Sequence, residues 1–144
     1  MRHTNIPAVF LVYLRKNKIL LARRQNTGYH DGDYSLVSGH VEAGESFTKA
    51  MIREAEEEAG LILFSEEIHV VHVQHRKSAW DGSERTDVYF LLKDSAKDPC
   101  NLEPKKCSEL AWFGVNNLPD NVIGGVKRAI GSILKEQWYS EYGW

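Results

Sequence analysis

Four of the six glutamates between Gly39 and Gly60 are spaced around one arginine in a pattern that suits phosphate chemistry. Glu54, Glu57 and Glu58 are separated by three or four residues, so on an α-helix their carboxylates crowd one face. Such like charges repel each other, and a divalent cation would relieve the repulsion. Mg²⁺ and Mn²⁺ prefer carboxylate oxygens and complete their coordination with water and substrate phosphates. For an arbitrary E-x-x-E-E spacing the favoured interpretation is a solvated acidic face, but the flanking glycines and Arg53 reverse this preference and favour a metal site for phosphate chemistry.

Glu45 and Arg53 complete the cluster. A guanidinium group can hold a carboxylate through two parallel hydrogen bonds, and we expect Arg53 to hold Glu45 on the loop that enters the helix. Clustered carboxylates also raise one another's pKa, which suits one of them to act as a general base on a water molecule.

A helix must position these side chains. Ser46 or Thr48 can cap its N-terminus, Gly60 can supply its C-terminal turn, and no proline interrupts the segment between them. Apolar residues occupy other sides of this helix, namely Met51, Ile52, Ala55 and Ala59. The segment therefore predicts an amphipathic helix of about three turns.

The rest of the chain alternates strand patterns with loops. Apolar or alternating segments predict strands at Pro7–Tyr13, Ile19–Ala22, Tyr34–Val37, His69–His75, Thr86–Lys93 and Leu110–Val115. Polar turns at 15–18 and 77–85 predict two hairpins, and 26–33 predicts a loop. Asn121–Tyr139 has a helical apolar stripe at Val122, Val126, Ile130 and Leu134. Strands mixed with two helices predict one α+β domain over residues 1–144, with a mixed β-sheet between helices.

Length, net charge and cysteine content limit the classes of protein to which this chain can belong. The chain has 144 residues, is 42% hydrophobic and carries a net charge of −2 without a long basic run. The nearly neutral charge argues against binding to a nucleic-acid polymer or a membrane surface. No segment predicts a transmembrane helix or a secretory signal, so we expect a cytoplasmic protein. Cys100 and Cys107 are too few for a four-ligand zinc site, and we interpret them as reduced bystanders, with a redox or metal role left open.

The stretch GHVEAGESFTKAMIREAEEEAGL resembles the Nudix box, G-x5-E-x7-R-E-U-x-E-E-x-G-U, in which U is a bulky aliphatic residue. Seven fixed positions match, namely Gly39, Glu45, Arg53, Glu54, Glu57, Glu58 and Gly60. Leu61 meets the closing aliphatic position, whereas Ala55 is smaller than the pattern prefers. The resemblance implies a Nudix-type α/β/α sandwich.

The resemblance also implies roles for the box residues. Glu54, Glu57 and Glu58 would bind Mg²⁺, or Mn²⁺, with a backbone carbonyl of Gly39 as an additional ligand. Glu57 would activate the water, and the other two catalytic residues, Glu45 and Arg53, would support the loop and orient the helix. The implied reaction is attack of water on a phosphorus of a small nucleotide, namely a nucleoside diphosphate linked to another moiety. We expect the protein to be a monomer or a homodimer.

Outside the box the resemblance implies further substrate contacts. Glu103 and Glu109 lie where members often take another ligand or base. Arg24, with Arg23, can reach a phosphate or remain a solvated strand end. In the MutT-like branch, which hydrolyses oxidised guanine nucleotides, an asparagine after a similar segment binds the purine edge, which makes Asn121 a candidate. A helix N-cap is the slightly favoured alternative for it.

Aromatic and histidine residues have competing interpretations. Stacking on a base and packing in the core are both open to Tyr34, Trp80, Tyr89, Trp112 and Phe113. His69 and His75 would lie on one face of a strand and His72 on the other, which favours solvent or packing roles over zinc. His30 is expected at the surface.

The expected substrate is a normal or oxidised (deoxy)nucleoside triphosphate, split into monophosphate and pyrophosphate. The alternatives are ADP-ribose, a nucleotide sugar or a dinucleoside polyphosphate. No proline occurs between Gly60 and Pro99 and no tyrosine between Gly60 and Tyr89, where members of those groups tend to carry them. A noncatalytic nucleotide-sensing module is disfavoured because all four box glutamates are present.

Overall fold

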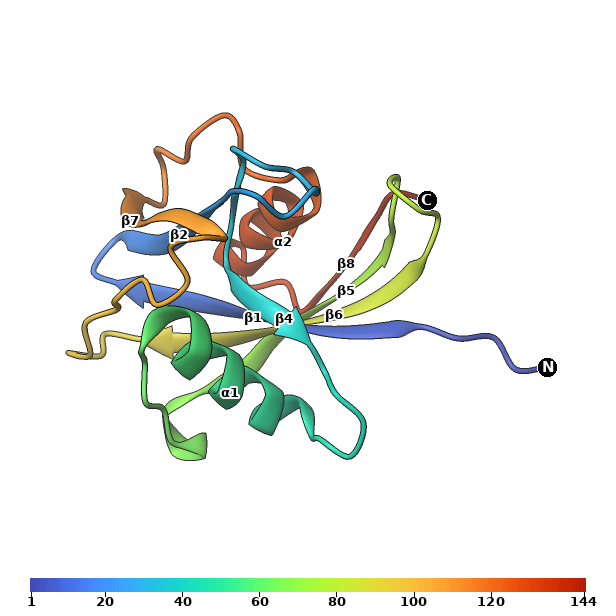
Figure 1. The fold of residues 1–144 in the computed structure, drawn as a ribbon, viewed down its shortest axis with the longest axis horizontal. Coiled ribbons are helices and arrows are strands. Elements are labelled where there is room, and N and C mark those ends of the chain that lie inside the picture. The colour runs from blue at the N-terminus through green and yellow to red at the C-terminus, as the bar shows by residue number, and fades with distance from the viewer.

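An eight-stranded mixed β-sheet forms the centre of the molecule, and α1 and α2 lie on opposite sides of it in the computed structural model, which describes all 144 residues (Figure 1). The strands are β1 (Ile6–Arg15), β2 (Lys18–Arg24), β3 (Tyr34–Ser35), β4 (Val37–His40), β5 (His69–Lys77), β6 (Glu84–Lys93), β7 (Cys107–Gly114) and β8 (Tyr139–Tyr142). The helices are α1 (Phe47–Ala59), the short 3₁₀ helix η1 (Ser65–Glu67) and α2 (Gly124–Leu134). This arrangement confirms the predicted α+β sandwich.

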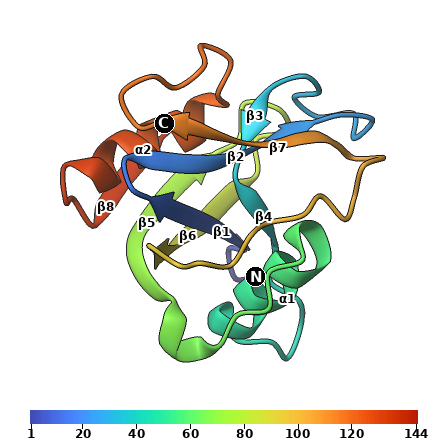
Figure 2. The same cartoon turned by 90° about the vertical axis from the view of Figure 1, so that its left-hand side faces the viewer.

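The sheet runs in the order β3-β2-β1-β6-β5-β8. Two of its pairings are parallel, β1 with β6 and β5 with β8, whereas the other pairings are antiparallel. β1 exchanges partners along its length, because its first half pairs with β4 and its end pairs with β2. β2 continues beyond that point alongside β7 (Figure 2). The exchange brings Gly39, at the start of the box, next to Val9 of the central strand.

β1 is buried on both faces, which explains its uninterrupted apolar sequence. Val9, Leu11 and Tyr13 belong to the core beneath α1, while Ala8, Phe10 and Val12 belong to the core beneath α2. The side of α1 that faces the first core consists of small or flexible residues, Ala50, Met51, Ala55 and Ala59. Ala55 is fully buried there, so the departure from the box pattern lies at a close packing contact.

Several predicted boundaries are wrong. The strand predicted at Tyr34–Val37 is split between β3 and β4, and β7 begins at Cys107, since Arg24 of β2 pairs with it. Cys107 is therefore the first residue of a strand.

The last helix is shorter than predicted, because it begins at Gly124 and ends at Leu134. Glu136 then adopts a left-handed conformation with φ of 58° and the chain returns as β8, which the sequence analysis missed. No helix in the structure combines the length and apolar character needed to cross a membrane.

Candidate active site

α1 carries the box glutamates on a helix whose two ends are well defined. The Ser46 hydroxyl accepts a hydrogen bond from the Lys49 backbone N–H at 3.1 Å, which identifies Ser46 and not Thr48 as the N-cap. Gly60 ends the helix with a positive φ of 62°, and its N–H bonds back to the last turn. The predicted helix is therefore confirmed to within one residue at each end.

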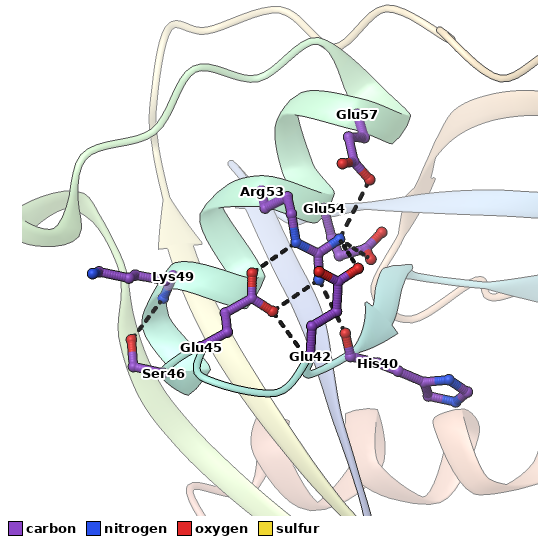
Figure 3. Close-up of polar contacts among 8 residues, drawn as sticks. All are labelled: His40, Glu42, Glu45, Ser46, Lys49, Arg53, Glu54 and Glu57. Atoms are coloured by element: carbon purple, nitrogen blue, oxygen red, sulfur yellow. Dashed lines mark hydrogen bonds and ion pairs between the residues drawn. The ribbon is translucent and has the colours of Figure 1, made fainter.

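Arg53 is the centre of a polar network that joins the loop to the helix (Figure 3). Its Nε and Nη2 donate to the two carboxylate oxygens of Glu45 at 2.7 and 2.9 Å, which confirms the predicted pairing. Nη1 donates to Glu54 at 2.7 Å and to Glu57 at 3.4 Å. Hydrogen bonds from Arg53, and then from the Glu42 backbone, lower the pKa of Glu45 to about 2. One guanidinium thus aligns three box carboxylates.

Glu58 is the box carboxyl that lies deepest. Burial raises its pKa, and a hydrogen bond and the charge of Glu54 raise it further, whereas a backbone hydrogen bond from Ser38 opposes the shift. The raised pKa favours the protonated form of Glu58, and a bound cation would favour its ionised form instead.

Gly39 lies directly against Glu54, and a side chain there would collide with it. A β-carbon on Gly39 would overlap the Glu54 carboxyl group and lie 2.7 Å from its Cγ. A side chain at residue 39 would therefore displace the Glu54 carboxyl group from its position next to the Gly39 backbone.

A cleft of about 980 Å³ opens beside α1 and is lined by Gly39, Glu54, Glu57 and Glu58. Two substrate-binding candidates from outside the box, Arg24 and Glu103, also line it. Their predicted contact with substrate stays a prediction. The charge of Glu103 contributes to the raised pKa of Glu58, which places the two carboxyl groups near each other.

The other three substrate-binding candidates do not line the cleft. Tyr34 is buried, its hydroxyl donates to Glu109, and its ring packs edge-on against Phe113 at 5.1 Å. Asn121 donates from its side-chain nitrogen to the carbonyl of Gly32 at 2.9 Å. The N-cap of α2 is Ile123, so the favoured N-cap interpretation of Asn121 is wrong.

Sequence reasoning missed several side chains of the cleft. Arg76 of β5 and Arg85 of β6 are cross-strand neighbours, and both line the cleft. Arg76 binds the fully buried Asp87 at 2.6 Å. Arg85 reaches the His40 ring at 3.1 Å, next to Gly39. No local motif predicts such contacts, although alternating polar residues in β5 and β6 indicated strand faces.

The histidines of β5 have packing or solvent roles, as expected. His72 is buried, and its two ring nitrogens bond to the carbonyl of Gln137 at 2.8 Å and the hydroxyl of Ser140 at 2.7 Å. His69 is exposed. No three acidic, histidine or cysteine side chains already converge as ligands on one point.

Known proteins with related sequences carry the same domain. The family model described as the NUDIX domain matches residues 4–131. A NAD-capped RNA hydrolase NudC of Vibrio parahaemolyticus is 28% identical over 125 residues, and one of Edwardsiella ictaluri is 30% identical over 126 residues. Each alignment covers 86% of this chain and 45% of the relative, so the chain spans less than half the length of these relatives.

Solved structures share the fold. A MutT NUDIX hydrolase from Burkholderia pseudomallei superposes with a TM-score of 0.80 at 24% identity, over 90% of this chain and 98% of that one. A MutT protein from Methanosarcina mazei Go1 gives a TM-score of 0.80 at 16% identity, over 94% and 97% of the two chains. With the matched family model, the intact box on α1 and this shared fold, the chain belongs to the Nudix family.

Proposed function

We propose that this protein is a divalent-metal-dependent hydrolase of a diphosphate bond in a nucleotide. The observation that carries the proposal is the cleft, because Glu54, Glu57 and Glu58 line one space of about 980 Å³ together with Gly39. A cavity of this size accommodates a nucleotide-sized ligand. The favoured substrate is a normal or oxidised (deoxy)nucleoside triphosphate, giving the monophosphate and pyrophosphate.

The residues present fit a hard cation. The donors are carboxylate oxygens, and the Glu54–Glu58 pair is a buried site where a positive charge is favourable. Glu54, Glu57 and Glu58, with the Gly39 carbonyl, would hold Mg²⁺ or Mn²⁺ after leaving their present partners. A bound cation supplies polarisation of the phosphate oxygens and a lower pKa for water.

Three side chains of the protein have separate roles in this proposal. Glu57 has 54% of its side chain exposed, so it can accept the proton of the attacking water. Arg53 holds Glu54 and Glu45 and so fixes the direction of the carboxylates. Arg24 lies in the cleft wall with a charge that suits a substrate phosphate.

A dinucleotide is the second candidate substrate. The relatives named NAD-capped RNA hydrolases act, by that name, on a NAD-linked end, which also contains a diphosphate between two nucleosides. The same carboxylates would serve either substrate, so product analysis must separate them.

The proposal is tested by incubating the purified protein and Mg²⁺ with dGTP, 8-oxo-dGTP, ATP, ADP-ribose, NAD, a nucleotide sugar and diadenosine tetraphosphate. We expect at least one to be cleaved at a diphosphate bond, and EDTA to abolish cleavage. Glu57→Gln should lower turnover on the order of 10²- to 10⁴-fold, the usual contribution of a general base. Glu56→Gln, an exposed neighbour outside the cleft, is the matched control. A panel left intact, or a fully active Glu57→Gln, would refute the proposal.

A further inference from the structure

Two aromatic side chains from distant loops meet at the cleft. Tyr29 lies in the loop between β2 and β3, and Trp80 lies in the turn between β5 and β6. Their ring centroids are 5.6 Å apart and their planes are at 90° to each other. Both line the cleft that contains the box glutamates.

Both loops are held in place by polar contacts. The Tyr29 carbonyl accepts hydrogen bonds from Arg24 Nε at 2.7 Å and from the Thr27 hydroxyl at 2.9 Å. The Arg24 guanidinium also lies over the Tyr29 ring, 5.3 Å from its centroid. On the opposite loop, the backbone N–H of Trp80 donates to the Ser78 hydroxyl at 3.2 Å. The aromatic pair is therefore positioned before any ligand arrives.

Trp80 differs from the other aromatic candidates because most of its surface is exposed. It is 69% exposed, whereas Tyr89 is buried and stacked on Phe10 at 4.7 Å. Trp112 packs edge-on against Tyr13 at 4.9 Å, on the α1 side of the sheet. An aromatic surface exposed inside a binding cleft is available for contact with a ligand, and covering it removes apolar area from water.

The perpendicular arrangement defines what can cover it. Two rings at right angles form a corner, in which a third planar ring can stack on one face while its edge meets the other ring. Aliphatic or phosphate groups gain little from such a corner, whereas every nucleobase has a face that stacks.

We infer that Trp80, positioned against Tyr29, stacks on the nucleobase of the bound nucleotide and determines the affinity for it. This inference rests on the proposed function, which places the phosphates at Glu54, Glu57 and Glu58 in the same cleft. Stacking reads the ring face and not its hydrogen-bonding edge, so Trp80 favours bases over base-free ligands and purines over the smaller pyrimidines.

The test measures binding separately from turnover. The probes are the α,β-methylene analogues of ATP, GTP and CTP, which resist cleavage between the first two phosphates, and inorganic tripolyphosphate, which has no base. Affinities are measured by calorimetry with Mg²⁺ for the wild type, Trp80→Ala, Trp80→Phe and Trp138→Ala. Trp138 is the matched control, because it is 75% exposed and lies outside the cleft.

We expect Trp80→Ala to raise the Kd of the nucleotide analogues by about 10-fold or more, the loss typical of one base stack, and to leave tripolyphosphate within about twofold. Trp80→Phe should retain most of the affinity, and Trp138→Ala all of it. Unchanged nucleotide binding by Trp80→Ala, or an equal loss for tripolyphosphate, overturns the inference. If the analogues bind as expected but no substrate is hydrolysed, the proposed function fails while the stacking role stands.

Discussion

Two arginine–carboxylate pairs lie beside the cleft, one on the α1 side and one on the α2 side. Arg53 and Glu45 have 24% and 14% of their side chains exposed, and the same guanidinium also binds Glu54 and Glu57. Arg76 has 14% exposed and Asp87 none, and Asp87 is the only carboxylate that Arg76 contacts. The first pair distributes one charge over three box carboxylates, whereas the second neutralises a carboxylate that is shielded from water. We therefore expect the first to matter most for catalysis and the second for stability.

The largest effect on stability should follow from removing one partner of the buried pair. Arg76→Met leaves Asp87 without a partner inside the protein, which should cost about 3–5 kcal/mol of unfolding free energy. Arg53→Met, at a more exposed site, should cost only about 1 kcal/mol of unfolding free energy. Because it also frees Glu54, we expect its main effect to be a lower turnover. Urea denaturation compares the variants.

Arg85→Met is the control for this comparison, because Arg85 is the cross-strand neighbour of Arg76 and its carboxylate contact, Asp81, lies 3.7 Å away and is partly exposed. Its cost should stay below about 1 kcal/mol. A loss for Arg53→Met equal to that for Arg76→Met would remove the distinction between the two pairs.

An intermediate effect is expected at the contact between β4 and α1. Gly39→Ala forces Glu54 away from its position, and we expect a loss of about 1–3 kcal/mol together with reduced turnover. Gly131→Ala is the matched control, since no atom lies within 4 Å of its added β-carbon and it lies inside α2. There the substitution should stabilise by about 0.5–1 kcal/mol. An unaffected Gly39→Ala would show that Glu54 has room to move.

The smallest effect is a change with pH. The pKa of Glu45 is about 2 in the folded protein, below its ordinary value of 4.5, so its ionised form favours folding. This contribution is complete above about pH 4.5 and is lost as the pH falls towards 2. The stability difference between the wild type and Glu45→Gln should therefore shrink between pH 6 and pH 3. A constant difference for Glu45→Gln over this range would contradict the ion-pair assignment.

The parts of the site that sequence reasoning placed correctly are local. The Ser46 cap, the Gly60 turn and the Glu45–Arg53 pairing depend on residues within one loop and one helix, where spacing translates directly into geometry. Tyr34 and Asn121 show the opposite case. Each has a side chain suited to ligand binding, yet one packs against Phe113 and the other holds the Gly32 carbonyl.

Strand register explains what the sequence could not provide. Asp87 is opposite Gln74 in the ladder and diagonal to Arg76, and a shift by one residue would turn each of them to the other face. β8 was missed because its four residues acquire a strand conformation only by pairing with β5. The meeting of Tyr29 and Trp80, 5.6 Å apart, likewise depends on how two loops are carried by different strands.

The sequence by itself determined the family, the mixed α+β fold and the carboxylate helix. The box residues are close in sequence, so one helix and the loop before it are enough to bring their side chains together. Only the tertiary structure decided which other side chains share the cleft. The side chains that line the cleft from outside the box come from separate loops and strands, and include Arg24, Arg76, Trp80 and Glu103. Their positions depend on burial and on the pairing register, which are properties of the whole sheet. The same properties keep Tyr34, Glu109 and Asn121 out of the cleft. The pattern of the box is therefore a local property of this chain, whereas the lining of the cleft depends on the whole fold.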